Sequence, residues 1–313
     1  MRRSFTLMLV IGLTMLISSC ASFSDSTSEM NNELTLRVMT FNIRYGTAND
    51  GVNAWRNRRH AVTALIRKYG PELVGLQEAL RFQIDEILSD LPEYEMIGVG
   101  RDDGKTRGEY SAILYRKERF TVKEFDTFWL SDSPEAVGSK SWGNSIPRIC
   151  TWAQFVDHQN DDRPFALWNT HFDHQSPEAR RRSAQLIRQK INVRSITLPV
   201  IVTGDLNAGE DSPPLRELTG GTRSDRSSLP VFIDTFRSIH HCNNNDESER
   251  VGTFNGFVGT NDGDKIDYIL IRPGYFEVLG AFIIHDTYPA ADQPNENRYP
   301  SDHFPVFAEL RFR

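Results

Sequence analysis

Cysteine and long apolar runs are both scarce in this sequence, and each scarcity excludes a class of protein. Three cysteines among 313 residues are too few for a scaffold built on disulfides. Cys150 and Cys242 lie far apart, so one disulfide and two separate buried thiols both remain open, and neither belongs to the spaced Cys/His pattern of a zinc site. The apolar run at residues 5–17 is shorter than the ~20 residues of a membrane-spanning helix. The sequence therefore predicts neither a disulfide-rich domain nor a transmembrane helix.

Positive charge is also in deficit. Lysine and arginine total 36 against 42 acidic residues, which gives a formal net charge of −6. A protein that binds nucleic acid is usually basic, because phosphate contacts supply much of its affinity. The acidic balance therefore disfavours DNA or RNA as a partner. It does not exclude one, since a local basic patch together with a bound metal suffices.

The first 33 residues have the composition of an export signal followed by a tether. A pair of arginines precedes the apolar run, which ends in the tetrapeptide ISSC at Cys20. This tetrapeptide resembles a bacterial lipobox, whose cysteine is lipidated. We therefore predict a signal peptide over residues 1–19, a lipid on Cys20 and a flexible Ser-rich tether over residues 20–33. The expected location is outside the cytoplasm, as a membrane-anchored lipoprotein; the alternative is an ordinary cleaved signal with an incidental cysteine.

Residues 34–313 alternate between strand patterns and helix patterns, and we predict one α/β domain. Helical spacing of apolar residues predicts helices over residues 61–69, 81–89 and 177–193. Apolar, β-branched runs predict strands over residues 34–42, 73–77, 111–116, 152–156, 165–170, 199–203, 265–272, 277–285 and 304–312. Two sheets packed face to face, with helices outside, would bury these runs. Residues 130–149, rich in Ser, Pro and Gly, are expected to form a long loop in which specificity can reside.

Polar residues of catalytic type recur where these strands begin or end. Any one of them alone would more often be a turn or cap residue, but the repetition indicates a site built at the edges of the sheets. The residues are Asn42, Glu78, His171, Asp205 with Asn207, Asp267, and Asp302 with His303.

Together these residue types suit the hydrolysis of a phosphate ester. That reaction requires neutralised phosphoryl oxygens, an activated water and a stabilised leaving oxygen. Carboxylates such as Glu78 and Asp302 are the hard oxygen ligands that Mg²⁺ or Mn²⁺ prefers. Asp205 can accept a proton from water, and His303 can stabilise developing charge if a buried acid such as Asp267 keeps it protonated.

The order of the motifs FNIRYG, LQE, GEYSAILYR, NTHFDH, GDLNA, KIDYIL and SDHFPV resembles the endonuclease/exonuclease/phosphatase superfamily. The resemblance extends over about residues 34–312, nearly the whole mature chain. It implies a four-layer α/β sandwich, in which two packed mixed β-sheets carry helices on both outer faces. It also implies one or two bound Mg²⁺ or Mn²⁺ ions.

The resemblance assigns a role to each matching residue. Asn42, Glu78 and Asp302 would lie at the metal. His171 would contact the scissile phosphate, with Glu109 as its carboxylate partner. Asp205 would position or deprotonate the attacking water, and Asn207 would hold phosphate or metal. His303, paired with Asp267, would stabilise the transition state.

Three functions remain open at this point. The leading hypothesis is a monomeric phosphodiesterase or phosphatase that acts, by in-line attack of water, on a small sugar-linked or lipid-linked phosphate. The first alternative is an extracellular nuclease for DNA or RNA, and the second is a non-catalytic surface binding module on the same scaffold. Whether His174 reaches the site stays open, while Trp129, Trp142 and Trp152 are expected to pack in the core.

Overall fold

The computed structural model describes Met1 and residues 34–313, except residues 196, 221–231, 242–250 and 291–294. The predicted signal peptide, Cys20, the tether and Cys242 lie outside the described residues. Cys150 is a buried free thiol. In the part of the chain that is described, no helix combines the length and the apolar character needed to cross a membrane.

The first sheet has six strands in the order β11-β14-β1-β2-β4-β3. Their bounds are Thr35–Asn42 for β1, Leu73–Ala79 for β2, Tyr94–Ile97 for β3, Tyr110–Arg116 for β4, Phe276–Ile283 for β11 and Val306–Phe312 for β14. Helix α1 (Trp55–Tyr69) connects β1 to its parallel neighbour β2, and it ends at Gly70, whose φ of 54° is the left-handed conformation that glycine favours. The apolar faces of α1 and α2 (Arg81–Asp90) pack on this sheet.

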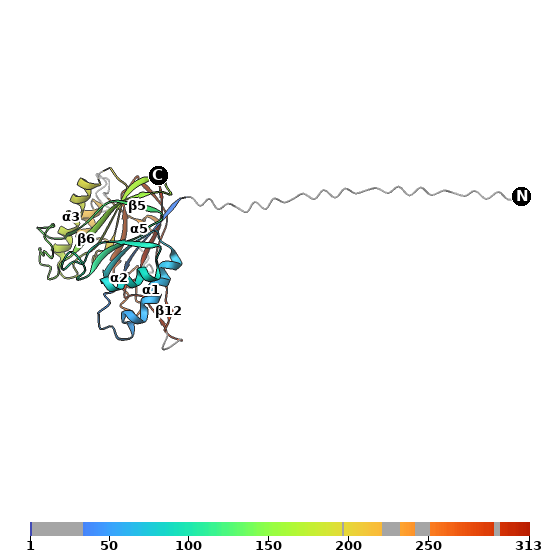
Figure 1. Ribbon diagram of the computed structural model, residues 1–313, viewed down its shortest axis with the longest axis horizontal. Coiled ribbons are helices and arrows are strands. Elements are labelled where there is room, and N and C mark those ends of the chain that lie inside the picture. Colours follow the sequence, from blue (N-terminus) through green and yellow to red (C-terminus); the bar gives the residue numbers. More distant parts are fainter. Residues whose placement is uncertain (2–33, 196, 221–231, 242–250, 291–294) are drawn as a thin grey trace. The chain divides into compact units, whose positions relative to one another are not determined.

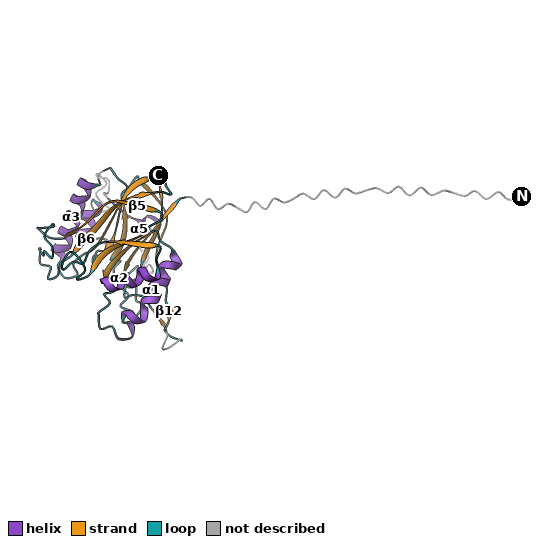
Figure 2. Ribbon diagram, in the orientation of Figure 1, coloured by secondary structure: helices purple, strands orange, loops and turns teal. Residues whose placement is uncertain are grey.

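The second sheet has six strands in the order β5-β6-β7-β8-β10-β9. Their bounds are Phe120–Trp129 for β5, Ile149–Asp157 for β6, Arg163–His171 for β7, Val200–Asp205 for β8, Ile233–Asp234 for β9 and Asp267–Ile271 for β10. Helix α3 (Pro177–Arg194) connects β7 to its parallel neighbour β8 and packs on this sheet together with α4 (Pro213–Thr219). Figure 1 follows the chain through these elements, and Figure 2 shows the strands lying between the helices.

The space between the two sheets is filled mainly by apolar side chains of both, which confirms the predicted four-layer α/β sandwich. A buried polar network also joins the sheets. Gln77 of β2 donates to Asn169 Oδ1 of β7 at 2.7 Å, and Thr203 of β8 donates to the same oxygen at 3.0 Å. Asn169 in turn donates to the carbonyls of Leu76 and Ala112. These bonds satisfy polar groups that burial would otherwise penalise, and they fix one sheet against the other.

The remaining described elements are short: the 3₁₀ helix η1 (Gly51–Asn53), α5 (Thr235–Ile239) and a two-stranded ribbon of β12 (Tyr288–Pro289) and β13 (Asn297–Arg298). The sequence patterns did not predict these elements, nor α4, β9, β3 and β5. Strand β5 pairs with β6 at the edge of the second sheet, with a register shift between Val122 and Glu124, and its central side chains face solvent. An edge strand of this kind lacks the apolar run that marks a buried strand.

Candidate active site

Strand pairing brings the predicted polar residues to one edge of the sandwich. Asn42 is the last residue of β1, and His171 and Asp205 are the last residues of the parallel strands β7 and β8, where they lie opposite each other. Asp267 is the first residue of the antiparallel strand β10, and its pairing partner is also Asp205. Carboxyl ends of parallel strands share an edge with the amino ends of antiparallel neighbours. The topology therefore places residues from distant parts of the chain side by side.

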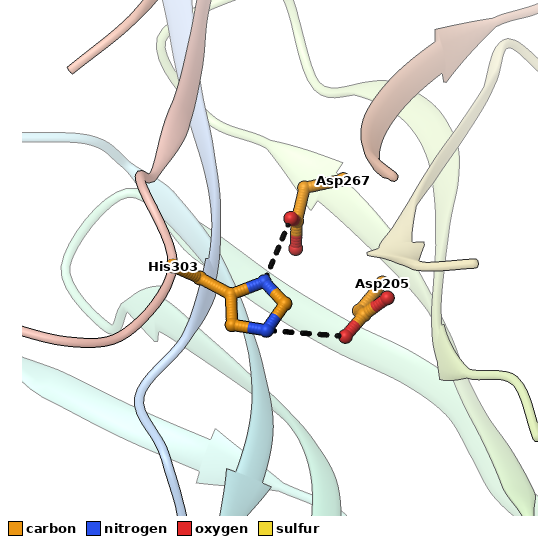
Figure 3. Close-up of side chains that lie close together, drawn as sticks. All are labelled: Asp205, Asp267 and His303. Atoms are coloured by element: carbon orange, nitrogen blue, oxygen red, sulfur yellow. Dashed lines mark hydrogen bonds and ion pairs between the residues drawn. The ribbon is translucent and has the colours of Figure 1, made fainter. Parts of the chain in front are cut away.

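The centre of the site is a buried His–Asp pair that faces a second carboxylate (Figure 3). His303 Nδ1 lies 2.9 Å from Asp267 Oδ2, and His303 Nε2 lies 3.8 Å from Asp205 Oδ2. All three side chains are almost fully buried. The predicted pairing of His303 with Asp267 is thus present. Its geometry directs the other ring nitrogen at Asp205.

The surroundings of His303 and Asp205 raise the pKa of both side chains. Burial alone would lower the pKa of His303, but the charge and hydrogen bond of Asp267 outweigh burial and raise it to about 10. Burial raises the pKa of Asp205 to about 7, and repulsion from Asp267 adds to the rise. His303 is therefore held as a cation at neutral pH. Asp205 has the affinity for a proton that a general base requires near pH 7.

Asn207 and His171 form the opposite wall of the site. The Asn207 side-chain amide donates to the Phe172 carbonyl at 3.1 Å and lies 3.0 Å from His171 Nε2. The Asn207 backbone amide donates to Asp205 Oδ1 at 2.9 Å, which fixes that carboxylate. Burial lowers the pKa of His171, and the nearby Arg148 guanidinium lowers it further. A neutral His171 ring fits these contacts, since its Nε2 can then accept a hydrogen bond from Asn207.

Among the described side chains, Glu109 and His171 do not form a direct hydrogen bond, so their predicted partnership is not seen as a contact. Both Glu109 oxygens accept hydrogen bonds from the Arg101 guanidinium at 2.7 Å, while His171 Nδ1 has no hydrogen-bond partner among the described residues. The physical reason is that a bidentate guanidinium occupies the carboxylate oxygens that face it. Glu109 and His171 still line one cavity together. Arg101, from the turn between β3 and β4, was not anticipated because no motif marks it.

The predicted metal residues Asn42, Glu78 and Asp302 lie on the side of the site that faces Arg44. Asn42 Nδ2 donates to Glu78 Oε1 at 3.1 Å and to Asp205 Oδ2 at 3.0 Å. Arg44 lies 4.0 Å from Glu78 Oε2 and 3.7 Å from Asp302 Oδ2. Burial raises the pKa of Asp302, and repulsion from Glu78 adds to the rise. The buried carboxylate of Asp302 and the partly buried carboxylate of Glu78 repel each other, and together they are an oxygen-rich donor set that a hard divalent cation fits.

A second group of possible ligands consists of Asp205, Asp267 and His303, whose ligand atoms all lie within 4.8 Å of one another. Of the two groups we favour Glu78 and Asp302 for the cation. In the second group the His303 Nδ1 and Asp267 Oδ2 atoms already share a hydrogen bond, and the imidazole nitrogen is a softer donor than Mg²⁺ prefers. The site therefore contains a candidate metal position next to a candidate general base.

Most of the predicted site residues line one cavity of about 790 Å³, namely Glu78, Glu109, His171, Asp205, Asn207, Asp302 and His303, whereas Asn42 and Asp267 lie behind its wall. His174 reaches it, which the sequence left open, and its Nδ1 lies 2.9 Å from Arg148 Nη2. Arg148 and Ile146 come from the predicted loop over residues 130–149, which has no helix or strand before β6. The lining residues that sequence reasoning also missed are Arg44, Tyr45, Phe254, Thr260, Asp262, Gly263, Asp264 and Ile266.

Three buried polar residues, Thr253, Asn255 and Ser301, form hydrogen bonds that hold the main chain of the site residues in place. The sequence patterns did not single them out. Thr253 Oγ1 accepts the Asp267 backbone amide at 3.1 Å, and Ser301 Oγ donates to the Asn42 carbonyl at 2.7 Å. Asn255 donates from its side chain to the Ser301 carbonyl at 3.2 Å. Ser301 belongs to the SDHFPV motif, whereas the only signal of Thr253 and Asn255 is that they precede the KIDYIL motif. None of the tryptophans expected to pack in the core lines the cavity, and Trp152 stacks on Trp168 at 5.2 Å between ring centroids.

Comparison with known proteins agrees with this geometry. The model of the Endonuclease/Exonuclease/phosphatase family matches residues 39–303. An endonuclease/exonuclease/phosphatase of Bacteroides vulgatus is 36% identical, with 89% of this chain and 99% of that chain covered at a TM-score of 0.75. A mannosyl-6-phosphatase of Bacteroides thetaiotaomicron is 33% identical, with 88% and 100% covered at a TM-score of 0.77.

The uncharacterized protein L388 of Acanthamoeba polyphaga mimivirus is 28% identical over 185 residues, which is 56% of this chain and 68% of the viral protein. The family match spans every strand end that contributes a predicted site residue. The chain therefore belongs to the endonuclease/exonuclease/phosphatase family, whose named activities are all hydrolyses of phosphate esters.

Proposed function

We propose that this protein is a divalent-cation-dependent phosphatase that acts on a small, sugar-linked phosphate. The observation that carries the proposal is the buried His303–Asp267 pair, which faces Asp205 inside a cavity of about 790 Å³. When water attacks a phosphate ester directly, it needs a proton acceptor, and the phosphoryl group needs a nearby positive charge. Asp205 and the cationic His303 ring supply these on one wall of the cavity.

Asp205 is the group that accepts the proton of the attacking water. Two neighbours hold its carboxylate in place, the Asn207 backbone amide at 2.9 Å and the Asn42 side chain at 3.0 Å. Its pKa of about 7 makes it a stronger base than an exposed aspartate. A cation held by Glu78 and Asp302, with Asn42 beside them, would neutralise charge on the phosphoryl oxygens.

His303 stabilises the charge that develops on the phosphoryl group. Asp267 keeps its ring charged and fixes its orientation, so little reorganisation is needed during the reaction. The Asn207 amide and the His171 ring hold the phosphate from the opposite wall. No side chain is required as a covalent nucleophile, because the water is activated directly.

A sugar-linked substrate is supported by two observations. A protein that is 33% identical to this chain, and is covered over its whole length, is a mannosyl-6-phosphatase. The cavity wall also combines the apolar side chains of Phe254 and Ile266 with the carboxylates of Asp262 and Asp264, which suits a ring with both C–H and hydroxyl groups. We take Mg²⁺ as the working cation, because Glu78 and Asp302 offer oxygen ligands.

We further propose that the protein is exported and anchored by a lipid on Cys20. The support is the arrangement of the arginine pair, the apolar run and the ISSC tetrapeptide in the sequence. Metabolic labelling with a fatty-acid analogue tests this proposal, and Cys20→Ala provides the control that should remain unlabelled.

The experiment for the proposed activity compares four substrates with the purified full-length protein and Mg²⁺. The substrates are a hexose 6-phosphate, a simple phosphodiester, a phospholipid and supercoiled plasmid, each with an EDTA control. Cation-dependent phosphate release from the hexose phosphate, with intact plasmid, is the expected result. Rapid nicking of plasmid without hexose phosphate turnover would instead establish a nuclease.

A further inference from the structure

One aromatic side chain in the cavity is exposed although its ring touches the catalytic histidine. Phe254 is 52% exposed and lines the cavity. Its ring centroid lies 5.3 Å from that of His303, and the ring planes make an angle of 72°. What distinguishes Phe254 from other exposed apolar side chains is its position in the wall of the cavity, next to His303. A surface of this kind at the mouth of a site is available to a ligand.

Hydrogen bonds hold the main chain that carries this ring in a fixed position. The Phe304 amide donates to the Thr253 carbonyl at 2.7 Å, and the Asn255 amide donates to the Asp302 carbonyl at 2.7 Å. Phe254 therefore forms a bridge with His303 that is closed by hydrogen bonds on both sides. An aromatic side chain on a fixed main chain has only two side-chain torsions to lose when a ligand packs on it. The same bridge keeps the ring next to the His303 side chain.

The wall around Phe254 supplies the polar half of a binding surface. Thr260, Asp262 and Asp264 line the same cavity, and their oxygens can accept hydrogen bonds from hydroxyl groups. A pyranose ring has an apolar C–H face and a rim of hydroxyl groups, so it matches an aromatic ring beside carboxylates. A short acyclic alcohol presents no such face, and an acyl chain presents no hydroxyl rim.

We propose that Phe254 determines substrate specificity, because the pyranose ring of the substrate packs on its exposed face. The phosphate on that sugar then lies between His303 and Asp205. This assignment rests on the proposed phosphatase function for its kinetic test, and it has a binding test that does not depend on turnover. Phe254 takes no part in proton transfer. Its substitution should therefore change only the binding of the sugar, which is the leaving group of the reaction.

The kinetic test compares mannose 6-phosphate with glycerol 3-phosphate in the presence of Mg²⁺. Phe254→Ala is expected to lower kcat/KM for the hexose phosphate by about tenfold or more, and to change it by less than about threefold for glycerol phosphate. Phe254→Trp should retain the preference for the hexose, whereas Phe254→Leu, which is apolar but not flat, should lose it. The matched control is Val258→Ala on the same loop, because Val258 is 75% exposed and does not line the cavity.

Equal losses for both substrates would overturn the proposal, since Phe254 would then only shield His303 from water. The binding test uses Asp205→Asn protein and calorimetric titration with mannose 6-phosphate. Weaker binding when Phe254→Ala is added supports the proposal. Unchanged binding, or no binding of any hexose phosphate, contradicts it. A wild type that binds the sugar phosphate through Phe254 but does not hydrolyse it would contradict the proposed function alone.

Discussion

His303 Nδ1 and Asp267 Oδ2 lie 2.9 Å apart although their residues are 36 positions apart in sequence. The pair forms because Asp267 begins strand β10 while His303 lies just before β14 of the other sheet. The two sheets therefore contribute one residue each to the catalytic pair. Any change in how the sheets pack changes the geometry of this hydrogen bond.

The first prediction concerns this pair. Asp267→Asn and His303→Ala should each lower kcat by about 10²–10⁴-fold, because both remove the cationic imidazole from the transition state. The double variant should be little worse than either single variant, since the two residues act as a unit. Steady-state kinetics on all three variants measures this coupling. Fully multiplicative losses would show that the residues act independently.

The second prediction concerns the cation. EDTA should abolish activity and added Mg²⁺ should restore it. Glu78→Gln and Asp302→Asn should each weaken Mg²⁺ binding in a calorimetric titration, because each removes an anionic oxygen ligand. Asp85→Asn is the matched control: this carboxylate pairs with Arg81 on the exposed face of α2 and lies outside the cavity. Unchanged Mg²⁺ affinity in both site variants would contradict the assignment of the ligands.

The third prediction separates the two possible roles of Glu109. Because Arg101 occupies both of its carboxylate oxygens, Glu109→Gln and Arg101→Gln should reduce thermal stability and activity to similar extents. Parallel thermal melts and rate measurements test this similarity. A loss of activity found only in Glu109→Gln would indicate that Glu109 acts on His171 in the reaction.

The fourth prediction concerns the polar network between the sheets. A Cβ atom at Gly75 would lie 2.6 Å from Asn169 Oδ1 and would also clash with Thr203, so the network has to shift. Gly75→Ala should lower the free energy of unfolding by about 1–3 kcal/mol. Gly280→Ala is the matched control, because no atom of the described residues lies within 4 Å of the Cβ that it would add, and it should change stability by less than about 0.5 kcal/mol. Urea unfolding of both variants provides the comparison, and equal stabilities would contradict the role of the network.

Much of the fold and site could be predicted because buried strands have a strong sequence signal. The apolar runs before Asn42, Glu78 and Asp205 mark three such strands, and the polar residue at each end marks the edge where they meet. Strand β5 has no comparable signal, because Lys123, Glu124 and Phe125 in its middle are exposed. Side-chain pairing is harder still to predict. The partner of Glu109 depends on where one turn places Arg101, and no residue type or spacing encodes that position.

The most direct test of the account is the rate of phosphate release from a hexose 6-phosphate by wild type and by Asp205→Asn. We expect Mg²⁺-dependent release by wild type and a rate lower by about 10²–10⁴-fold in the variant, whose amide cannot accept a proton from water. Both proteins should bind the substrate with similar affinity. Equal rates in the two proteins, or release that EDTA does not affect, would contradict the central claim.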